Sequence, residues 1–264
     1  MAARDPKEAA AIRELMIANR ILAHQGVVDA FGHISVRNPI NPKRYFMSRP
    51  RAPELVIEDD IWEFHLDSTP VEPKTLSIYS ERYIHGGIYM ARPDVNAVCH
   101  NHAYQLIPYG ITETAMRPVL HVASVIGSEV PIWEIREEFG NTNLLVTDNE
   151  RGKSLARAFG QGRAVLMRGH GASVGAHSLK ACVYVSIYLM VNAELVREAK
   201  KLGGEIKYLN PGEIKLLDTM NFSEPPLERA WEYWCRRAGF AAGQPAKPVR
   251  RAKPSRAKRT PRRR

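Results

Sequence analysis

Cysteines, long apolar runs and nucleotide-binding signatures are scarce or missing in this chain of 264 residues. Its three cysteines, Cys99, Cys182 and Cys235, are odd in number and widely spaced, which argues against a disulfide framework. No apolar run reaches the roughly 18 residues of a membrane span, and residues 1–6 lack the apolar core of a signal peptide. Because neither G-x-G-x-x-G nor a P-loop occurs, the usual nucleotide sites are not expected. These absences favour a protein of the reducing cytoplasm.

Acidic residues are missing from residues 241–264, which hold three Lys, seven Arg and four Pro. This tail accounts for the whole net charge of +10, so residues 1–240 are electrically balanced. We expect residues 1–240 to form one domain. The tail has little apolar surface to bury and repels itself, so we expect it to be disordered. Its charge permits non-specific contact with polyanions, although a solvated appendage without a dedicated partner is favoured.

Helix and strand patterns mix along residues 1–240 without strict βαβ alternation. Asp5 and Pro6 begin an amphipathic helix that is expected to end at Gly26. Short apolar or alternating runs predict strands, and further helices are expected at residues 77–90 and 178–201. The expected strands are residues 29–37, 45–48, 95–98 and 163–167. This order predicts an α/β layered domain built on a mixed sheet.

Two histidines in the run Val98-Cys99-His100-Asn101-His102 carry the first chemical signal. Successive side chains of a strand point to opposite faces, so His100 and His102 share one face. Cys99 then points the other way and is expected to be a packing residue. A catalytic divalent metal usually takes three protein ligands and keeps an open position. The pair is therefore half of a possible metal site.

Three other features could complete that site. His170 lies between two glycines after a predicted strand, where the backbone can turn sharply. Glu81 is on the predicted helix 77–90 and shares a face with His85, four residues later. The residues at positions 33, 35 and 37 form a polar row on a strand expected to be half-exposed, suited to an anionic group. Together they predict an oxygen-binding metal site with an acid/base carboxylate.

In this order, Glu81, His100-Asn101-His102 and Gly169-His170-Gly171 resemble the class II aldolase/adducin family, which includes fuculose- and ribulose-phosphate aldolases and epimerases. The resemblance spans residues 8 to 215. It implies a layered α/β/α domain around a mixed, largely antiparallel sheet, with one divalent metal ion per subunit. His100, His102 and His170 would be the metal ligands, and Glu81 the catalytic carboxylate and a fourth ligand in the empty enzyme. Zinc, manganese, cobalt and iron all accept these ligand types.

The chain departs from the sugar-phosphate aldolases at three places. Their Gly-Asn-x-Ser turn is replaced here by Gly32-His33-Ile34-Ser35, and their Ser-Ser-Glu by Tyr79-Ser80-Glu81. No tyrosine acid is found at His121-Val122. The patterns Gly-His-x-Ser-Val-Arg and Tyr-Ser-Glu-Arg-x-x-His are similar to a decarboxylase branch of the family. Members of that branch act on hydroxylated aromatic or pyridine dicarboxylates such as dihydroxyphthalate.

This resemblance implies a non-oxidative decarboxylase with Glu81 as the acid/base and with Arg37 or Arg82 facing a second substrate carboxylate. The candidate catalytic residues are Glu81, Arg82 and His85, and the candidate substrate-binding residues are His33, Ser35, Arg37, Tyr79 and Ser80. A small aromatic acid would be the substrate. The resemblance also implies a homo-oligomer, commonly a tetramer with active sites near the interfaces. Trp231, Tyr233 and Trp234 are candidates to cover a neighbour's site.

Two alternatives stay open at this point. The first is another reaction on the same scaffold, an aldolase or epimerase acting on a hydroxy-carbonyl or sugar-phosphate substrate. The second is a non-catalytic, adducin-like interaction module that uses the basic tail. The presence of Glu81 and all three histidines argues against the second. The ring, the carboxylate removed, the metal and the oligomer size are not determined by the sequence.

Overall fold

A seven-stranded sheet forms the middle layer of the computed structural model, which describes residues 4–240. The strand order is β3-β2-β1-β4-β7-β6-β5, and every neighbouring pair is antiparallel except β5 and β6. The strands are β1 (His33–Arg37), β2 (Arg44–Ser48), β3 (Ile61–His65), β4 (Ala97–Asn101), β5 (Ile132–Trp133), β6 (Ala164–Met167) and β7 (Gly171–Ala176). The expected mixed, largely antiparallel sheet is confirmed. The basic segment 241–264 lies outside the described residues, so its disorder stays a prediction.

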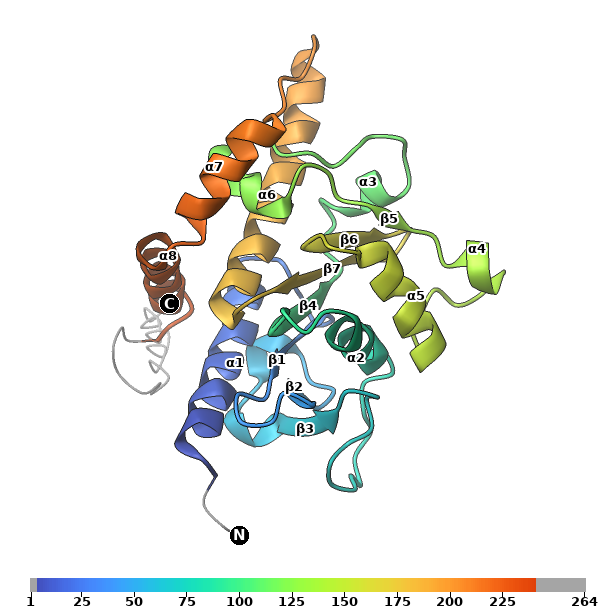
Figure 1. Cartoon of the computed structure of the whole chain (residues 1–264), viewed down its shortest axis with the longest axis vertical. Coiled ribbons are helices and arrows are strands. Elements are labelled where there is room, and N and C mark those ends of the chain that lie inside the picture. Colours follow the sequence, from blue (N-terminus) through green and yellow to red (C-terminus); the bar gives the residue numbers. More distant parts are fainter. Residues whose placement is uncertain (1–3, 241–264) are drawn as a thin grey trace, which may run out of the picture.

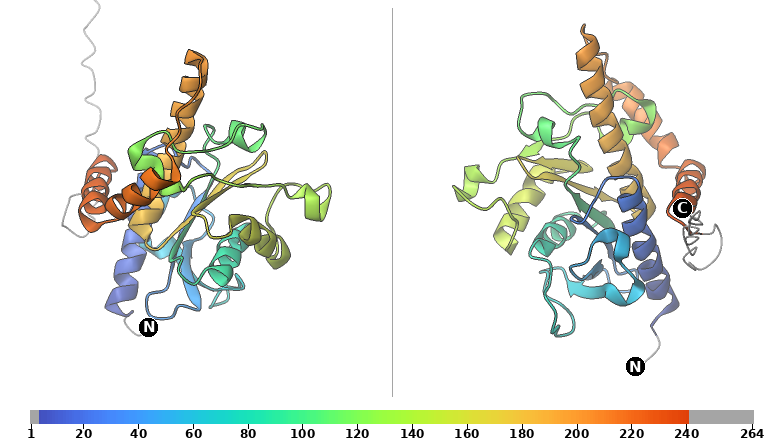
Figure 2. Two further views of the ribbon diagram at one scale, coloured as in Figure 1. Left: turned by 45° about the horizontal axis from the view of Figure 1, so that its top comes forward. Right: turned by 180° about the vertical axis from the view of Figure 1, so that it is seen from behind.

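Helices cover both faces of this sheet (Figures 1 and 2). One face carries the two long helices α1 (Pro6–His24) and α6 (Leu179–Leu202), with α8 (Glu224–Arg237) packed against both. The other face carries α2 (Arg82–Ala91) and α5 (Asn149–Phe159). The remaining helices are α3 (Ile107–Gly110), α4 (Arg136–Phe139) and α7 (Pro211–Asn221), and short 3-10 turns span Pro53–Leu55, Glu58–Asp60 and His121–Ile126. The layered α/β/α architecture expected from the sequence is confirmed.

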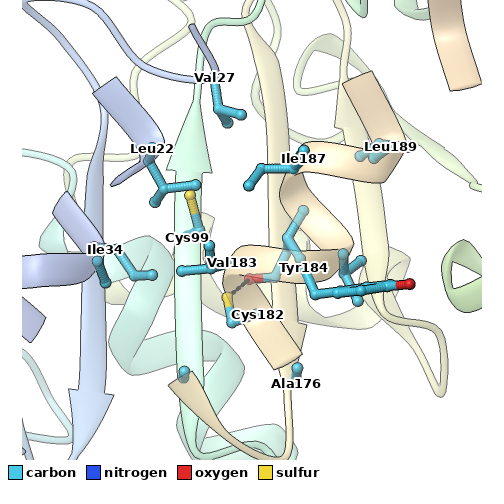
Figure 3. Close-up of a cluster of buried hydrophobic side chains, with 14 of the residues drawn as sticks. Leu22, Val27, Ile34, Cys99, Ala176, Cys182, Val183, Tyr184, Ile187 and Leu189 are labelled. Carbon is cyan, nitrogen blue, oxygen red and sulfur yellow. Dashed lines mark hydrogen bonds between the residues drawn. The ribbon is translucent and has the colours of Figure 1, made fainter. Parts of the chain in front are cut away.

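Alternation along the strands divides the apolar side chains between two cores. On β4, Cys99 belongs to the core under α1 and α6, whereas Val98 belongs to the core under α2 and α5. Figure 3 shows Cys99 pointing toward α6, close to Leu22 and Val183. Burial raises the pKa of the Cys99 thiol to about 12, so it stays protonated at neutral pH. Cys99 is a packing residue, as expected, and faces away from His100.

The first helix follows its sequence signals. The Asp5 side chain accepts a hydrogen bond from the Lys7 backbone N–H at 2.8 Å, and Pro6 occupies the first turn. Helix α6 begins after Ser178, whose side chain caps it. The sequence shows no long uninterrupted apolar run, yet by length and composition alone α6 could cross a membrane. However, 72% of its most apolar window is buried inside the fold, as is usual for a core helix. We therefore assign α6 to the core.

Two expected elements differ from the structure. The strand predicted at residues 29–37 begins only at His33, and it is buried on both faces rather than half-exposed because α2 covers its polar side. The helix predicted at residues 77–90 begins at Arg82, so Glu81 is its N-cap residue and is not inside it. Tyr79 is held outside the helix by two hydrogen bonds of its hydroxyl to the Arg51 backbone.

Helix α2 is seated by a close crossing with α5. A Cβ added to Gly87 would lie 2.4 Å from the Gly152 carbonyl oxygen, and one added to Gly152 would lie 2.4 Å from the Tyr83 carbonyl oxygen. Real Cβ atoms do not approach backbone so closely. The two glycines therefore let the helix backbones touch, which fixes the position of α2 and of Glu81 at its start.

We expect Gly87→Ala to lower the free energy of unfolding by about 3 kcal/mol, because the added methyl group forces the two helices apart. Urea unfolding followed by circular dichroism measures this change. The control is Gly110→Ala on α3, where the nearest atom to the added Cβ lies at an ordinary 3.4 Å. Equal stability of the two variants would contradict this account of the crossing.

Candidate metal centre

Four side chains from three parts of the fold converge at one edge of the sheet. His100 is on β4, His102 follows that strand, His170 lies in the turn between β6 and β7, and Glu81 caps α2. Each offers one ligand atom, and these four atoms lie within 4.8 Å of one another. The structure thus brings together all four residues that the sequence singled out as metal ligands.

Hydrogen bonds to backbone carbonyls aim two of the imidazoles. His100 Nδ1 donates to the Ala172 carbonyl at 3.1 Å, and His170 Nδ1 donates to the Leu144 carbonyl at 3.0 Å. In a neutral ring this leaves Nε2 with a free lone pair, which is the ligand form. The Nε2 atoms of His100 and His102 are 3.0 Å apart, and His170 Nε2 is 3.5 Å from a Glu81 oxygen. These lone pairs face a common point, as metal ligands do.

A glycine makes this convergence possible. A Cβ on Gly171 would lie 2.0 Å from the carbonyl oxygen of Asn101, the residue between His100 and His102. Only a residue without a side chain lets β7 approach β4 so closely at this point. Gly171 therefore allows the His170 turn to lie against the end of β4.

Glu81 is held in its charged form. Burial opposes ionisation, but the neighbouring imidazoles of His170 and His100 together with a backbone hydrogen bond outweigh it and lower the pKa of Glu81 to about 2. The Val146 backbone N–H also donates to Glu81 Oε1 at 3.1 Å. Burial lowers the pKa of His100 well below its usual value, which favours a neutral ring. One carboxylate and neutral imidazoles are a donor set that fits a divalent cation.

Beside this cluster lie several of the predicted substrate residues. The His33 ring is 5.3 Å from the His100 ring and 4.6 Å from the Tyr79 ring, between centroids. His33 Nδ1 is 2.6 Å from His85 Nε2, and Ser35 Oγ is 2.6 Å from His85 Nδ1. The structure therefore joins His33, Ser35 and His85 in one buried group. Ser80 is exposed and makes no hydrogen bond within residues 4–240.

The two predicted carboxylate-binding arginines are engaged elsewhere. Arg37 donates to four backbone carbonyls, at distances from 2.7 to 3.1 Å. Arg82 donates to the carbonyls of Ser68 and Tyr79 and to the Tyr83 hydroxyl. Each guanidinium nitrogen of both residues already donates a hydrogen bond within the fold, so the geometry does not favour either one as the partner of a substrate carboxylate. Arg168, a further candidate by position, forms an ion pair with Glu134.

Other groups near the cluster carried no clear sequence signal. The backbone groups of Leu144 and Val146 orient ligands, and backbone atoms have no residue signature. Phe31 is 67% exposed, and its ring centroid is 6.5 Å from that of His102. Tyr104 is 76% exposed, and its hydroxyl is 3.3 Å from an Asp29 oxygen. Exposed aromatic rings at the edge of a site are candidates to contact a ligand ring, and only the fold places them there.

Comparison with known proteins identifies the family. The Class II Aldolase and Adducin N-terminal domain matches residues 13–196, which include the four clustered side chains. The chain belongs to the class II aldolase and adducin family. The family expected from the ordered Glu, His-x-His and Gly-His-Gly motifs is thereby confirmed.

Two curated relatives of this class II aldolase family protein have decarboxylase names. Decarboxylase tropJ of Talaromyces stipitatus is 32% identical over 248 residues, covering 85% of this chain and 92% of the relative. The 3,4-dihydroxyphthalate decarboxylase of Arthrobacter keyseri is 27% identical over 237 residues, again covering 85% and 92%. The expectation of a carbon–carbon lyase agrees with both.

Solved structures agree with the family fold. An aldolase II superfamily protein from Pseudomonas syringae has a TM-score of 0.75 at 20% identity, covering 89% of this chain and 94% of that one. The L-fuculose 1-phosphate aldolase from Glaciozyma antarctica PI12 has a TM-score of 0.72 at 18% identity, covering 90% and 92%. At these identities the likeness concerns the fold alone.

We expect this family member, after dialysis against a chelator and then against a divalent metal, to retain about one ion per chain. His100→Ala should abolish stoichiometric binding because it removes a ligand, whereas His121→Ala, at an exposed position outside the cluster, should retain it. Elemental analysis of the dialysed proteins provides the measurement. Equal metal content in the two variants would rule out this centre.

Arg37→Met should act on stability rather than on substrate affinity. Four carbonyls, three of them buried, lose their donor, and we expect the free energy of unfolding to fall by about 3 kcal/mol. The KM of the folded fraction should change less than about twofold, since the guanidinium is engaged with backbone. Arg44→Met, which removes a partly exposed ion pair to Glu63 at 3.6 Å, is the matched control. A large rise in KM at unchanged stability would instead support a contact between Arg37 and the substrate.

Proposed function

We propose that this chain is a divalent-metal-dependent, non-oxidative decarboxylase of a hydroxylated aromatic or pyridine dicarboxylate, such as a dihydroxyphthalate. The observation that carries the proposal is the cluster of Glu81, His100, His102 and His170 in a chain similar along 85% of its length to two decarboxylases. Zinc, manganese, cobalt or iron would suit these ligands. All three cysteines are free and buried, which supports the proposed cytoplasmic location.

The three histidines would hold the ion, with Glu81 beside it. A divalent ion at this place would supply Lewis acidity toward the oxygens of a substrate with adjacent hydroxyl and carboxylate groups. The neutral imidazoles and their carbonyl partners keep the ligand atoms aligned before substrate arrives. The ligand atoms at the edge of the sheet are thus held in place before a planar chelating acid binds and can orient it.

Glu81 is the residue suited to move the proton. It is ionised in the resting protein, so it can accept the proton of the substrate's ring hydroxyl. It can then return that proton to the ring carbon that carries the departing carboxylate. The carbon–carbon bond breaks, carbon dioxide leaves, and the bonding pair restores the aromatic ring. The ring hydroxyl regains a proton from water, so one proton is consumed for each carboxylate lost.

Oligomerisation belongs to the same proposal. We propose a homo-oligomer, with four copies as the expected size. The expected role of α8 in covering a neighbour's site needs correction for two of its residues: Trp231 and Trp234 are 9% and 5% exposed and belong to this chain's own core. Tyr233, at 57% exposed, is the one of the three that is available to a second copy.

We expect the metal-loaded protein to release carbon dioxide from 3,4-dihydroxyphthalate or a related hydroxylated diacid. Glu81→Gln should lower kcat by about 10²–10⁴-fold, because it removes the proton shuttle, while the three histidines still bind metal. Carbon dioxide release and metal content are measured on the same samples. Glu150→Gln, an exposed change outside the cluster, is the control.

The assay separates the alternatives. Release no faster than the blank across several such diacids would contradict the proposal. Cleavage of a sugar phosphate such as fuculose 1-phosphate would instead favour the aldolase alternative. Absence of bound metal in the wild-type protein would favour the adducin-like interaction module.

A further inference from the structure

A row of four buried polar groups leads from the metal cluster into the interior of the domain. His33 Nδ1 lies 2.6 Å from His85 Nε2, His85 Nδ1 lies 2.6 Å from Ser35 Oγ, and Ser35 Oγ lies 2.8 Å from the Tyr89 hydroxyl. All four residues are between 0% and 3% exposed. The proposed mechanism uses none of them as an acid or base.

Strand and helix periodicity place these groups in line. His33 and Ser35 are two apart on β1 and point to the same face. His85 and Tyr89 are four apart on α2 and share the helix face that lies over this strand. The row is therefore built into the contact between β1 and α2.

The direction of the hydrogen bonds is decided at the Tyr89 end. Within residues 4–240, the Tyr89 hydroxyl has Ser35 as its hydrogen-bond partner and no second one. Burial raises the pKa of Tyr89, so the hydroxyl keeps its proton. A buried O–H that donates to nothing is costly, whereas a hydroxyl oxygen with an unused lone pair is tolerated more easily. Tyr89 therefore donates to Ser35.

Each following bond is then fixed. Ser35 Oγ accepts from Tyr89 and donates its own proton to His85 Nδ1. Burial lowers the pKa of His85 to about 3, so the ring is neutral and carries one N–H, which must be at Nε2. That N–H donates to His33 Nδ1. The remaining ring proton of His33 is consequently on Nε2.

The Nε2 atom of His33 is placed to meet a ligand. It lies on the side of the ring away from His85, and within residues 4–240 the one hydrogen bond of the His33 ring is the bond through Nδ1. The ring lies between those of Tyr79 and His100, the latter a proposed metal ligand. An N–H at this position offers a neutral donor to an oxygen bound beside the metal.

We propose that Tyr89 is a positioning residue which, through Ser35 and His85, fixes His33 as an Nε2–H donor to a carboxylate oxygen of the substrate. The identity of the acceptor rests on the proposed function, whereas the direction of the hydrogen bonds does not. With Arg37 and Arg82 engaged by backbone, this donor gives the chain a way to recognise a diacid without a free guanidinium.

The first test is spectroscopic and needs no turnover. In the zinc-loaded full-length protein labelled with ¹⁵N-histidine, long-range proton–nitrogen correlation distinguishes a protonated from an unprotonated ring nitrogen. We expect His33 to be protonated at Nε2 and unprotonated at Nδ1, with His33→Asn providing the assignment. A His33 ring protonated at Nδ1 and bare at Nε2 would overturn the proposal even if the enzyme were an active decarboxylase.

The second test removes only the Tyr89 hydroxyl. In Tyr89→Phe we expect the His33 signals to show a mixture of tautomers, and the dissociation constant for phthalate to rise about tenfold by calorimetry. Tyr45→Phe is the matched control, since Tyr45 is equally buried against α2 but bonds to Ser68 and the Arg82 carbonyl. It should change neither quantity.

Phthalate binding by itself tests the acceptor. His33→Phe, which cannot donate, should weaken phthalate binding at least as much as Tyr89→Phe, and His33→Asn, which keeps a donor, should recover part of it. An unchanged dissociation constant in His33→Phe would overturn the carboxylate contact. If phthalate binding behaves as expected but no diacid is decarboxylated, the proposed reaction fails and the direction of the hydrogen bonds stands.

Discussion

The facing lone pairs of His100, His102 and His170, with the Glu81 carboxylate among them, are the constraint on which this structure depends. Neutral imidazoles whose Nε2 atoms approach to 3.0 Å cannot satisfy one another without a proton or a cation between them. The fold holds His100 and His170 there through carbonyl partners on Nδ1, and Gly171 lets the His170 turn approach the end of β4. A domain that maintains such an arrangement at the edge of its sheet gains little stability from it, so the arrangement is best understood through what it binds.

Helix α2 links this cluster to the rest of the domain. Its first turn begins at Glu81, its inner face carries His85 and Tyr89, and its outer side meets α5 at the Gly87–Gly152 crossing. A shift of α2 would therefore move Glu81, His85 and Tyr89 together. Because sites of this kind tolerate little misplacement, the close crossing protects the relative positions of Glu81 and the three histidines that we propose as metal ligands.

The sequence predicted the site residues whose positions depend on local structure. It predicted less well the burial and hydrogen-bond partners that depend on elements distant in the chain. The alternation of His100 and His102 and the glycine-flanked turn at His170 are local, and the family resemblance joined them to Glu81. The burial of β1 was missed because it depends on α2, which is distant in sequence and covers the polar face. The same holds for Arg37: its charge suggested an anion site, but four carbonyls from other segments take up its donors. The sequence did not indicate a role for Tyr89 in the site, since a tyrosine four residues after a histidine is common in helices.

Charge balance explains why a site with few free cations can favour decarboxylation. Glu81 contributes one negative charge, and a bound divalent ion would leave the cluster with a single positive charge. The proposed dicarboxylate substrate would bring two negative charges, so the loaded site would carry an excess negative charge in a buried place where ionic groups are poorly solvated. Loss of carbon dioxide with uptake of a proton removes that excess. A neutral donor such as His33 could orient a carboxylate without compensating its charge, so the unfavourable electrostatic energy of the proposed diacid complex would be relieved only when carbon dioxide leaves.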